Sequence, residues 1–158
     1  MRSNISFDAG SLILINKVDR EFNLFDTILQ GSIGKTKHLK QSVKVFVYNR
    51  LSKCVSLKKI NQVYPQECFE SLGFKEIPKD RTLNRDLERI GIRYPFIIEK
   101  YQQLVKSREL ISEKQFIDWS SSYFEGKKAE MGALGYSRDK QPGKKQITWG
   151  ISTGINGR

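Results

Sequence analysis

The fold is decided at residues 115–123, which read Gln-Phe-Ile-Asp-Trp-Ser-Ser-Ser-Tyr. Before Ser112, apolar residues recur every three or four positions, which is typical of amphipathic helices. After Ser112 the period approaches two, which is typical of strands. This change of period predicts an α+β protein with a helical region at residues 1–112 and a strand-containing region at residues 113–158.

A second strand is expected from Ile147 to Thr153, followed by Gly154 and the pair Asn156-Gly157. Asn-Gly between apolar residues is a strong hairpin signal, because both turn positions need a positive φ. The strand that would return from this turn is missing from the sequence. We therefore expect an incomplete sheet.

The helical region is expected to begin with a helix that Ser11 caps and that continues to Leu29. Gly91 is expected to end a helix and Pro95 to begin another, because proline favours the first helical position. The helices predicted after the first one span residues 37–54, 56–63, 66–72, 81–90 and 95–110.

The helix at residues 37–54 has the clearest amphipathic pattern. Its expected apolar face contains Leu39, Val43, Phe46, Val47, Leu51 and Cys54, and its other side carries Lys37, Lys40, Lys44 and Tyr48.

The charge of the chain favours a polyanionic partner. The 158 residues carry a formal net charge of +11 and an isoelectric point near 9.7, which favours nucleic acid over a membrane surface. Residues 27–66 contain eight lysines and arginines and no acidic residue. We therefore expect binding to double-stranded DNA and not to a membrane.

Three groups of basic residues are candidate DNA contacts. Arg81, Arg85 and Arg89 recur every four residues and form the best candidate recognition face, although Asp86 and Glu88 could neutralise them in a solvated face. A second stripe is Lys37, Lys40 and Lys44, which has no acidic neighbour in sequence. The third group, Arg138, Lys144 and Lys145, flanks the strands and lies either along DNA or in ordinary loops.

Asp118 is a lone carboxylate in the middle of the first predicted strand. The alternating neighbours Phe116, Ile117 and Trp119 suggest that both strand faces are partly covered, and a covered carboxylate needs a cation, a metal or hydrogen-bond donors. The alternative is an edge-strand carboxylate that reaches solvent.

Other classes of site and location are disfavoured. Cys54 and Cys68, with His38 as the sole histidine, are too few for a zinc site or a disulfide framework. The sequence contains neither a signal-peptide pattern nor an apolar run of membrane-spanning length. We expect a soluble, cytoplasmic protein.

The motifs of the second region resemble those of insertion-sequence transposases with an Asp-Asp-Glu catalytic triad. The resemblance is carried by residues 116–126 (FIDWSSSYFEG), 135–139 (GYSRD) and 145–152 (KQITWGIS), and residues 78–83 (PKDRTL) extend it into the helical region. It implies that residues 113–158 begin an RNase H-like catalytic domain whose first strand carries the first catalytic residue at Asp118.

The resemblance also implies a chemistry. In the complete family site, the residue at the Asp118 position is a metal ligand, and two Mg²⁺ ions promote cutting and joining of DNA. No residue of this chain matches the second Asp or the Glu, and Pro142-Gly143 departs from the expected loop. We expect Mg²⁺ in the full-length enzyme, and neither stable Mg²⁺ binding nor activity in this chain.

These observations leave three interpretations. In the first, the chain is the N-terminal portion of a transposase that binds transposon ends, as a homo-oligomer or together with the full-length transposase. In the second, it is a non-catalytic DNA-binding protein or an inhibitor derived from a transposase. In the third, it is the partly unfolded product of a decayed reading frame.

Overall fold

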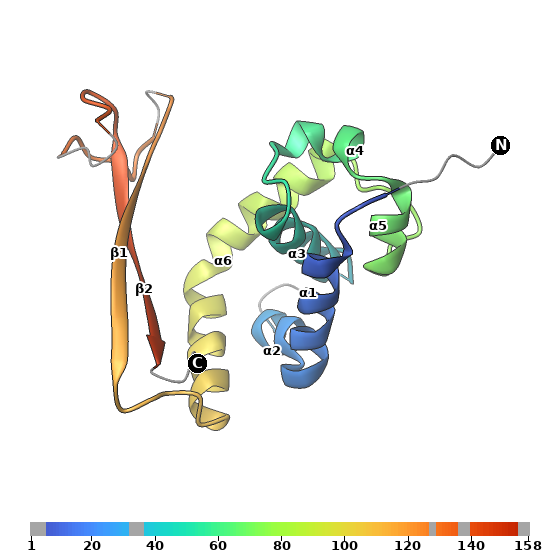
Figure 1. The fold of residues 1–158 in the computed structure, drawn as a ribbon, viewed down its shortest axis with the longest axis horizontal. Helices are drawn as coiled ribbons and strands as arrows, with labels where there is room; N and C mark the ends of the chain where they lie inside the picture. Colours follow the sequence, from blue (N-terminus) through green and yellow to red (C-terminus); the bar gives the residue numbers. More distant parts are fainter. Residues whose placement is uncertain (1–5, 32–36, 127–128, 136–139, 155–158) are drawn as a thin grey trace. The chain divides into compact units, whose positions relative to one another are not determined.

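The computed structural model describes residues 6–31, 37–126, 129–135 and 140–154, which contain both helices and an antiparallel sheet (Figure 1). The protein therefore has the predicted α+β composition. Its contacts divide the chain into two compact units, residues 1–104 and 105–158. The boundary predicted after Ser112 falls inside the second unit.

The first unit is helical and is built around α3. Its elements are α1 (Ala9–Phe22), α2 (Leu24–Leu29), α3 (Lys37–Leu51), the 3-10 helix η1 (Leu57–Lys59), α4 (Ile60–Val63), α5 (Gln66–Ser71) and most of α6 (Asp80–Ser107). Val45 and Tyr48 of α3 join Leu12 of α1, Phe69 of α5 and Leu83 of α6 in one buried core. Burial of this apolar area is the main driving force for the unit.

Helix α3 presents a different set of residues to the core than its pattern predicted. Tyr48, which was assigned to the lysine side, is buried, and its hydroxyl donates a hydrogen bond to the Asp8 carbonyl at 2.9 Å. Leu51 and Cys54, which were assigned to the apolar face, are exposed. The prediction was wrong for Tyr48 and Leu51 because α3 packs against neighbours on several sides, and a single apolar stripe does not describe such a helix. Cys54 lies beyond the end of α3 at Leu51, so the predicted end of this helix at residue 54 was also wrong.

The first predicted helix begins earlier than expected. Asp8 is its N-cap, and the Asp8 carboxylate accepts a hydrogen bond from the Gly10 N–H at 3.0 Å. Ser11, the predicted cap, lies inside α1 and donates its hydroxyl hydrogen to the Leu51 carbonyl of α3. An aspartate closer to the chain start therefore supplies the acceptor that the helix N-terminus requires.

The first predicted helix is also divided in two. Asn23 adopts a left-handed conformation with φ 48°, which asparagine tolerates better than most residues, and it separates α1 from α2. The buried Asp19 accepts a hydrogen bond from the Phe25 N–H at 3.1 Å, which satisfies a backbone donor in the first turn of α2. The expectation of one helix up to Leu29 was wrong.

Helix α6 continues through both residues that were expected to interrupt it. Pro95 lies inside the helix and lacks the N–H that would donate to the carbonyl of Gly91, four residues earlier. Both residues are exposed, so water can satisfy the freed carbonyl. Figure 1 shows that α6 changes direction along its length, as proline inside a helix causes.

A buried polar contact joins α6 to α3. Asp86 is 1% exposed and accepts a hydrogen bond from the Ser42 hydroxyl at 2.6 Å, although 44 positions separate the two residues. The Arg89 guanidinium approaches the same carboxylate at 3.4 Å. Because a buried carboxylate without partners is costly, this cluster fixes the N-terminal half of α6 against α3.

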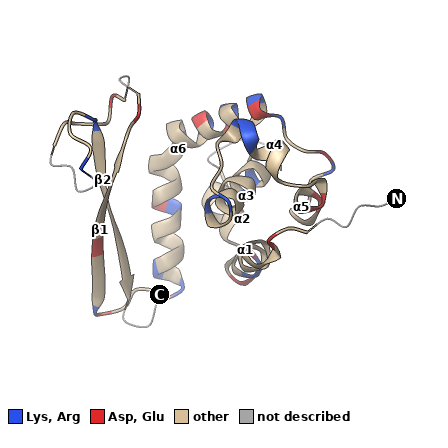
Figure 2. Ribbon diagram, turned by 45° about the horizontal axis from the view of Figure 1, so that its top comes forward, with Lys and Arg blue, Asp and Glu red and all other residues tan. Residues whose placement is uncertain are grey.

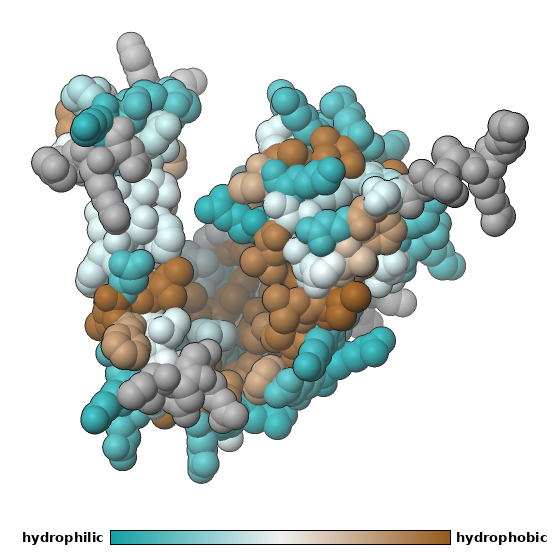
Figure 3. All heavy atoms as spheres, in the orientation of Figure 1, coloured by the Kyte–Doolittle hydropathy of each residue, from teal (hydrophilic) through white to brown (hydrophobic). Residues whose placement is uncertain are grey.

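The second unit contains a hairpin of two antiparallel strands, β1 (Gln115–Tyr123) and β2 (Gln146–Gly154), as the sequence predicted. In the register, Asp118 lies opposite Ile151. Phe116, Ile117 and Trp119 are each more than half exposed, and Figure 3 shows apolar surface on the hairpin. The expected partial cover of both faces of β1 is not found within the second unit, whose described residues place no layer over these side chains.

Two further expectations concern the turn after β2 and a membrane-spanning helix. The pair Asn156-Gly157, which predicted a further turn, lies outside the residues that the structure describes. No helix in the described part of the chain is long and apolar enough to cross a membrane.

Replacing Asp86 with alanine tests the contact between α3 and α6. We expect Asp86→Ala to lower the free energy of unfolding by about 2–4 kcal/mol, because it leaves the Ser42 hydroxyl buried without its acceptor. The exposed Glu88, two residues along α6, provides the control. Glu88→Ala should change the free energy of unfolding by less than about 0.5 kcal/mol. Urea unfolding followed by circular dichroism measures both values, and equal effects would contradict the assignment.

Candidate nucleic-acid interface

The lysines of α3 have acidic partners that their sequence neighbours do not reveal. The Lys44 ammonium lies 2.8 Å from the Asp19 carboxylate, and its side chain is only 14% exposed. The Lys40 ammonium lies 2.6 Å from the Asp26 carboxylate and 3.9 Å from that of Asp19. The absence of acidic residues nearby in the sequence therefore does not leave these two lysines unpaired, because α1 and α2 bring the Asp19 and Asp26 carboxylates onto α3.

The ion pairs also explain the titration of Asp19. Burial by itself would raise the pKa of this carboxyl group. The hydrogen bonds from Lys44 and from the Phe25 N–H, together with the charges of Lys44 and Lys40, outweigh that effect and hold the pKa below its ordinary value of 3.8. Lys44 therefore has a structural role, and we leave it out of the interface.

The arginines of α6 are more accessible than the α3 lysines. The side chains of Arg85 and Arg89 are 59% and 43% exposed, and both approach the buried Asp86 carboxylate. Arg81 is exposed, and its backbone N–H donates to the Asp80 carboxylate in the first turn. Figure 2 shows basic and acidic residues close together along this part of α6. The predicted recognition face therefore exists as a partly neutralised but accessible surface.

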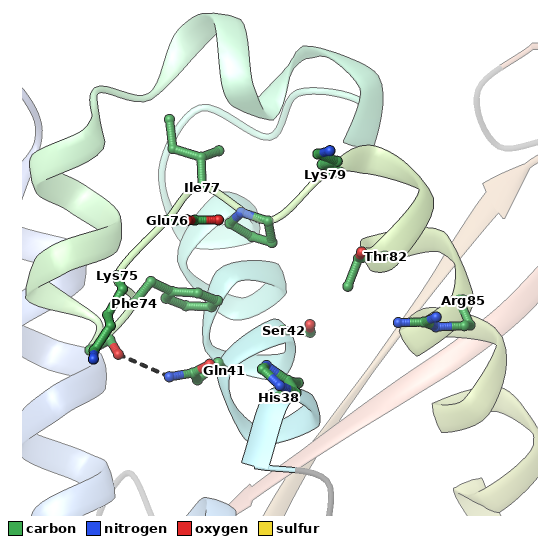
Figure 4. Close-up of a pocket in the computed structure, with 12 residues that line it drawn as sticks. His38, Gln41, Ser42, Phe74, Lys75, Glu76, Ile77, Lys79, Thr82 and Arg85 are labelled. Atoms are coloured by element: carbon green, nitrogen blue, oxygen red, sulfur yellow. Dashed lines mark hydrogen bonds between the residues drawn. The ribbon is translucent and has the colours of Figure 1, made fainter.

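The segment before α6 does not complete a compact helix-turn-helix. Helix α5 ends at Ser71, and the connection from Leu72 to Lys79 is longer than the usual turn of 3–4 residues. This connection instead borders a pocket of about 630 Å³ between α3 and the first turns of α6. The pocket is lined by His38, Phe74, Lys79 and Arg85 among others (Figure 4).

Sequence reasoning missed His38, Phe74 and Lys79 as members of a site. The available signal was an aromatic residue, Phe74, followed by two lysines in the segment Gly73 to Lys79, just before the predicted arginine helix. The contribution of α3 to the same pocket arises from tertiary packing and has no local signal.

The basic residues near the hairpin are engaged within the second unit. The Lys144 ammonium lies 2.9 Å from the Glu125 carboxylate and 4.6 Å from the centre of the Tyr123 ring. Lys145 donates a hydrogen bond to the Ala129 carbonyl at 2.9 Å. These contacts connect the segment after β1 to the segment before β2. Arg138 lies outside the described residues, as does the side chain of Lys37.

Asp118 is exposed at the middle of β1. Of the two interpretations of this carboxylate, the geometry favours the one in which it reaches solvent. Within the described ranges, no three histidine, cysteine, aspartate or glutamate side chains come together as metal ligands. One carboxylate does not fit a site for two Mg²⁺ ions, which need several oxygen ligands in octahedral geometry.

No family model, curated protein or solved structure matched this chain in the comparisons with known proteins.

Removing the Lys44 charge distinguishes a structural lysine from a surface cation. We expect Lys44→Met to reduce the free energy of unfolding by about 3 kcal/mol, because it leaves the buried Asp19 carboxylate without its closest partner. Arg81→Gln, on an exposed arginine, should change it by less than about 0.5 kcal/mol. Chemical denaturation at pH 7 provides the measurement. An unchanged free energy of unfolding in Lys44→Met would show that the ion pair is dispensable.

The lowered pKa of Asp19 predicts a pH dependence of stability. Its stabilising contribution should be complete well above pH 3.8 and should disappear as the pH falls through the lower pKa of the folded state. The stability difference between the native chain and Asp19→Asn should therefore be constant from about pH 5 to 7 and shrink toward pH 2. A difference that grows on acidification would contradict this assignment.

Proposed function

We propose that this chain is the N-terminal portion of an insertion-sequence transposase. Its helical unit binds double-stranded DNA at transposon ends, and its hairpin begins an RNase H-like catalytic domain. The observation that carries the proposal is the position of Asp118, at the centre of the first of two antiparallel strands and within the segment Asp-Trp-Ser-Ser-Ser-Tyr-Phe-Glu.

The surface of the hairpin supports this proposal. Phe116 and Ile151 share one face of the sheet with Asp118, and Ile117 and Trp119 lie on the opposite face. All four apolar side chains are more than half exposed. Because an isolated two-stranded hairpin is only marginally stable in water, this surface fits a sheet that further strands and helices cover.

The arginines of α6 support DNA binding. Arg81 and Arg85 lie one helical turn apart on an accessible surface, which suits contacts with successive phosphates or with guanine edges. The net charge of +11 adds a long-range attraction for the same partner.

DNA binding is proposed for this chain, and Mg²⁺-dependent cutting for the full-length transposase alone. Mg²⁺ is expected in the full-length transposase, where further carboxylates join the residue at the Asp118 position. The chain itself binds DNA in the cytoplasm without cutting it, as a homo-oligomer or beside the full-length transposase.

A second candidate function is a non-catalytic DNA-binding protein, including an inhibitor that occupies transposon ends. It is favoured by one observation: in the residues that the structure describes, Asp118 belongs to no group of three or more potential metal ligands. The transposase and the non-catalytic protein would bind DNA through the same arginine surface. They differ only in what the complete protein does after binding.

Charge removal on α6 tests DNA binding. We expect Arg81→Gln to weaken binding to duplex DNA about three- to tenfold at 100 mM salt and to reduce the salt slope by about one. Lys58→Gln in η1 is the matched control and should have no more than a twofold effect by the same electrostatic reasoning. Fluorescence anisotropy across a salt series measures both variants. Equal affinities of all three chains would contradict the interface.

Incubation with a supercoiled plasmid and Mg²⁺ tests the separation of binding from catalysis. The chain should leave the plasmid intact, and Asp118→Ala should bind DNA as the native chain does, because Asp118 lies outside the α6 surface. Nicking that disappears in Asp118→Ala would show that the chain is a catalyst and would contradict the proposed inactivity.

A further inference from the structure

The pocket beside α6 has the size and the boundaries of a ligand site. Its volume of about 630 Å³ lies within the range of about 300–1,000 Å³ that is usual for small-molecule pockets. Helix α3, residues 73–79 and the first turns of α6 form its walls, and all of them belong to the first unit.

The floor of the pocket is fixed by hydrogen bonds within the protein. The Ser42 hydroxyl donates to the buried Asp86 carboxylate, and the Gln41 amide donates to the Gly73 carbonyl at 2.9 Å. These contacts hold α3, α6 and the start of the 73–79 segment together. Hydrogen bonds within the protein therefore tie the walls of the pocket to one another.

The charge of the pocket lining selects an anion. Lys75, Lys79 and Arg85 contribute positive charges, His38 adds a titratable donor, and Glu76 is the single acidic residue among the lining residues. Figure 4 shows Arg85 reaching in from α6, with Thr82 one turn earlier on the same helix. Arginine and lysine around a hydroxyl are typical ligands of a phosphate group.

The opposite wall is apolar and aromatic. Figure 4 shows the Phe74 ring pointing from the 73–79 segment toward α3, across the pocket from Arg85. The Phe69 ring packs edge-on against it, with centroids 6.0 Å apart, and Ile77 and Pro78 extend the same wall. A half-buried ring held in this way is a platform on which a planar base can stack.

We propose that this pocket binds a nucleoside phosphate, with the phosphate at Arg85 and Lys79 and the base against Phe74. The ligand is either a free nucleotide or an unpaired nucleotide of a DNA strand, since both present the same chemistry. Inorganic phosphate would leave the apolar wall uncovered, and a nucleoside would place no anion beside Lys79 and Arg85. The site goes beyond the proposed contact of α6 with duplex DNA and does not require the chain to be part of a transposase.

Isothermal titration of the full chain tests the site with deoxyadenosine monophosphate, deoxyadenosine and inorganic phosphate as separate probes. The nucleotide should bind, and each of the other probes should bind at least about tenfold more weakly, because each lacks one half of the recognition. Equal affinity for the nucleotide and for inorganic phosphate, or no measurable nucleotide binding, would overturn the proposal. Binding of a glutamate-rich peptide as tightly as the nucleotide would also overturn it, because it would indicate a general anion-binding surface.

Variants assign the binding to the pocket. Phe74→Leu and Lys79→Gln should each weaken nucleotide binding about fivefold or more, and Lys58→Gln should not. Lys79 is exposed, so its variant remains informative if Phe74→Leu fails to fold. Unchanged binding in Lys79→Gln would place the nucleotide elsewhere and overturn the assignment.

Competition separates the two sources of the ligand and the two DNA-related proposals. A single-stranded oligothymidylate that displaces the nucleotide supports an unpaired strand as the ligand, and binding of the mononucleotide without displacement supports a free nucleotide. Arg81→Gln should weaken duplex binding without changing nucleotide affinity, because Arg81 does not line the pocket. If the native chain binds the nucleotide but has no affinity for duplex DNA, the pocket is supported and only the proposed function is contradicted.

Discussion

The hydrogen bond between Ser42 and the buried Asp86 positions the surfaces on which the functional account rests. It joins the middle of α3 to the N-terminal half of α6 across 44 positions of sequence. The arginines of α6 begin one turn before this contact and continue one turn after it, and the pocket lies directly beside it. An unpartnered carboxylate at this depth would be costly, so the pairing fixes the relative placement of the two helices.

Ion pairs within the first unit reduce the positive charge that α3 can offer to a partner. Much of the lysine charge that made α3 look like a DNA-binding helix is used to compensate the Asp19 and Asp26 carboxylates. Accessible positive charge lies along α6 and in the segment before it, at Lys79, Arg81 and Arg85. The proposed DNA contact therefore lies on α6, because the internal ion pairs engage Lys40 and Lys44 of α3.

The sequence predicted the features that depend on local pattern. Period-two alternation predicted β1 and β2, and period-3.6 spacing predicted the position of α3. It failed at Gly91 and Pro95, which suggested a break in α6 although the helix continues through both. It also failed where distant residues decide. The partners of Lys40 and Lys44 come from α1 and α2, and the pocket arises from three separate segments, so no local pattern contains them. Asp118 was expected to be covered because alternation cannot reveal whether a second layer exists.

We propose that the arginine surface of α6, fixed against α3 by Asp86, is the DNA-binding surface of this chain. Titration of the isotope-labelled protein with a short duplex, followed by the backbone amide resonances, tests it most directly. If DNA binds this surface, the largest changes in chemical shift should lie at residues 81–89 of α6. Changes confined to Lys40 and Lys44 of α3, or to the segments around Lys144, with α6 unaffected, would contradict it.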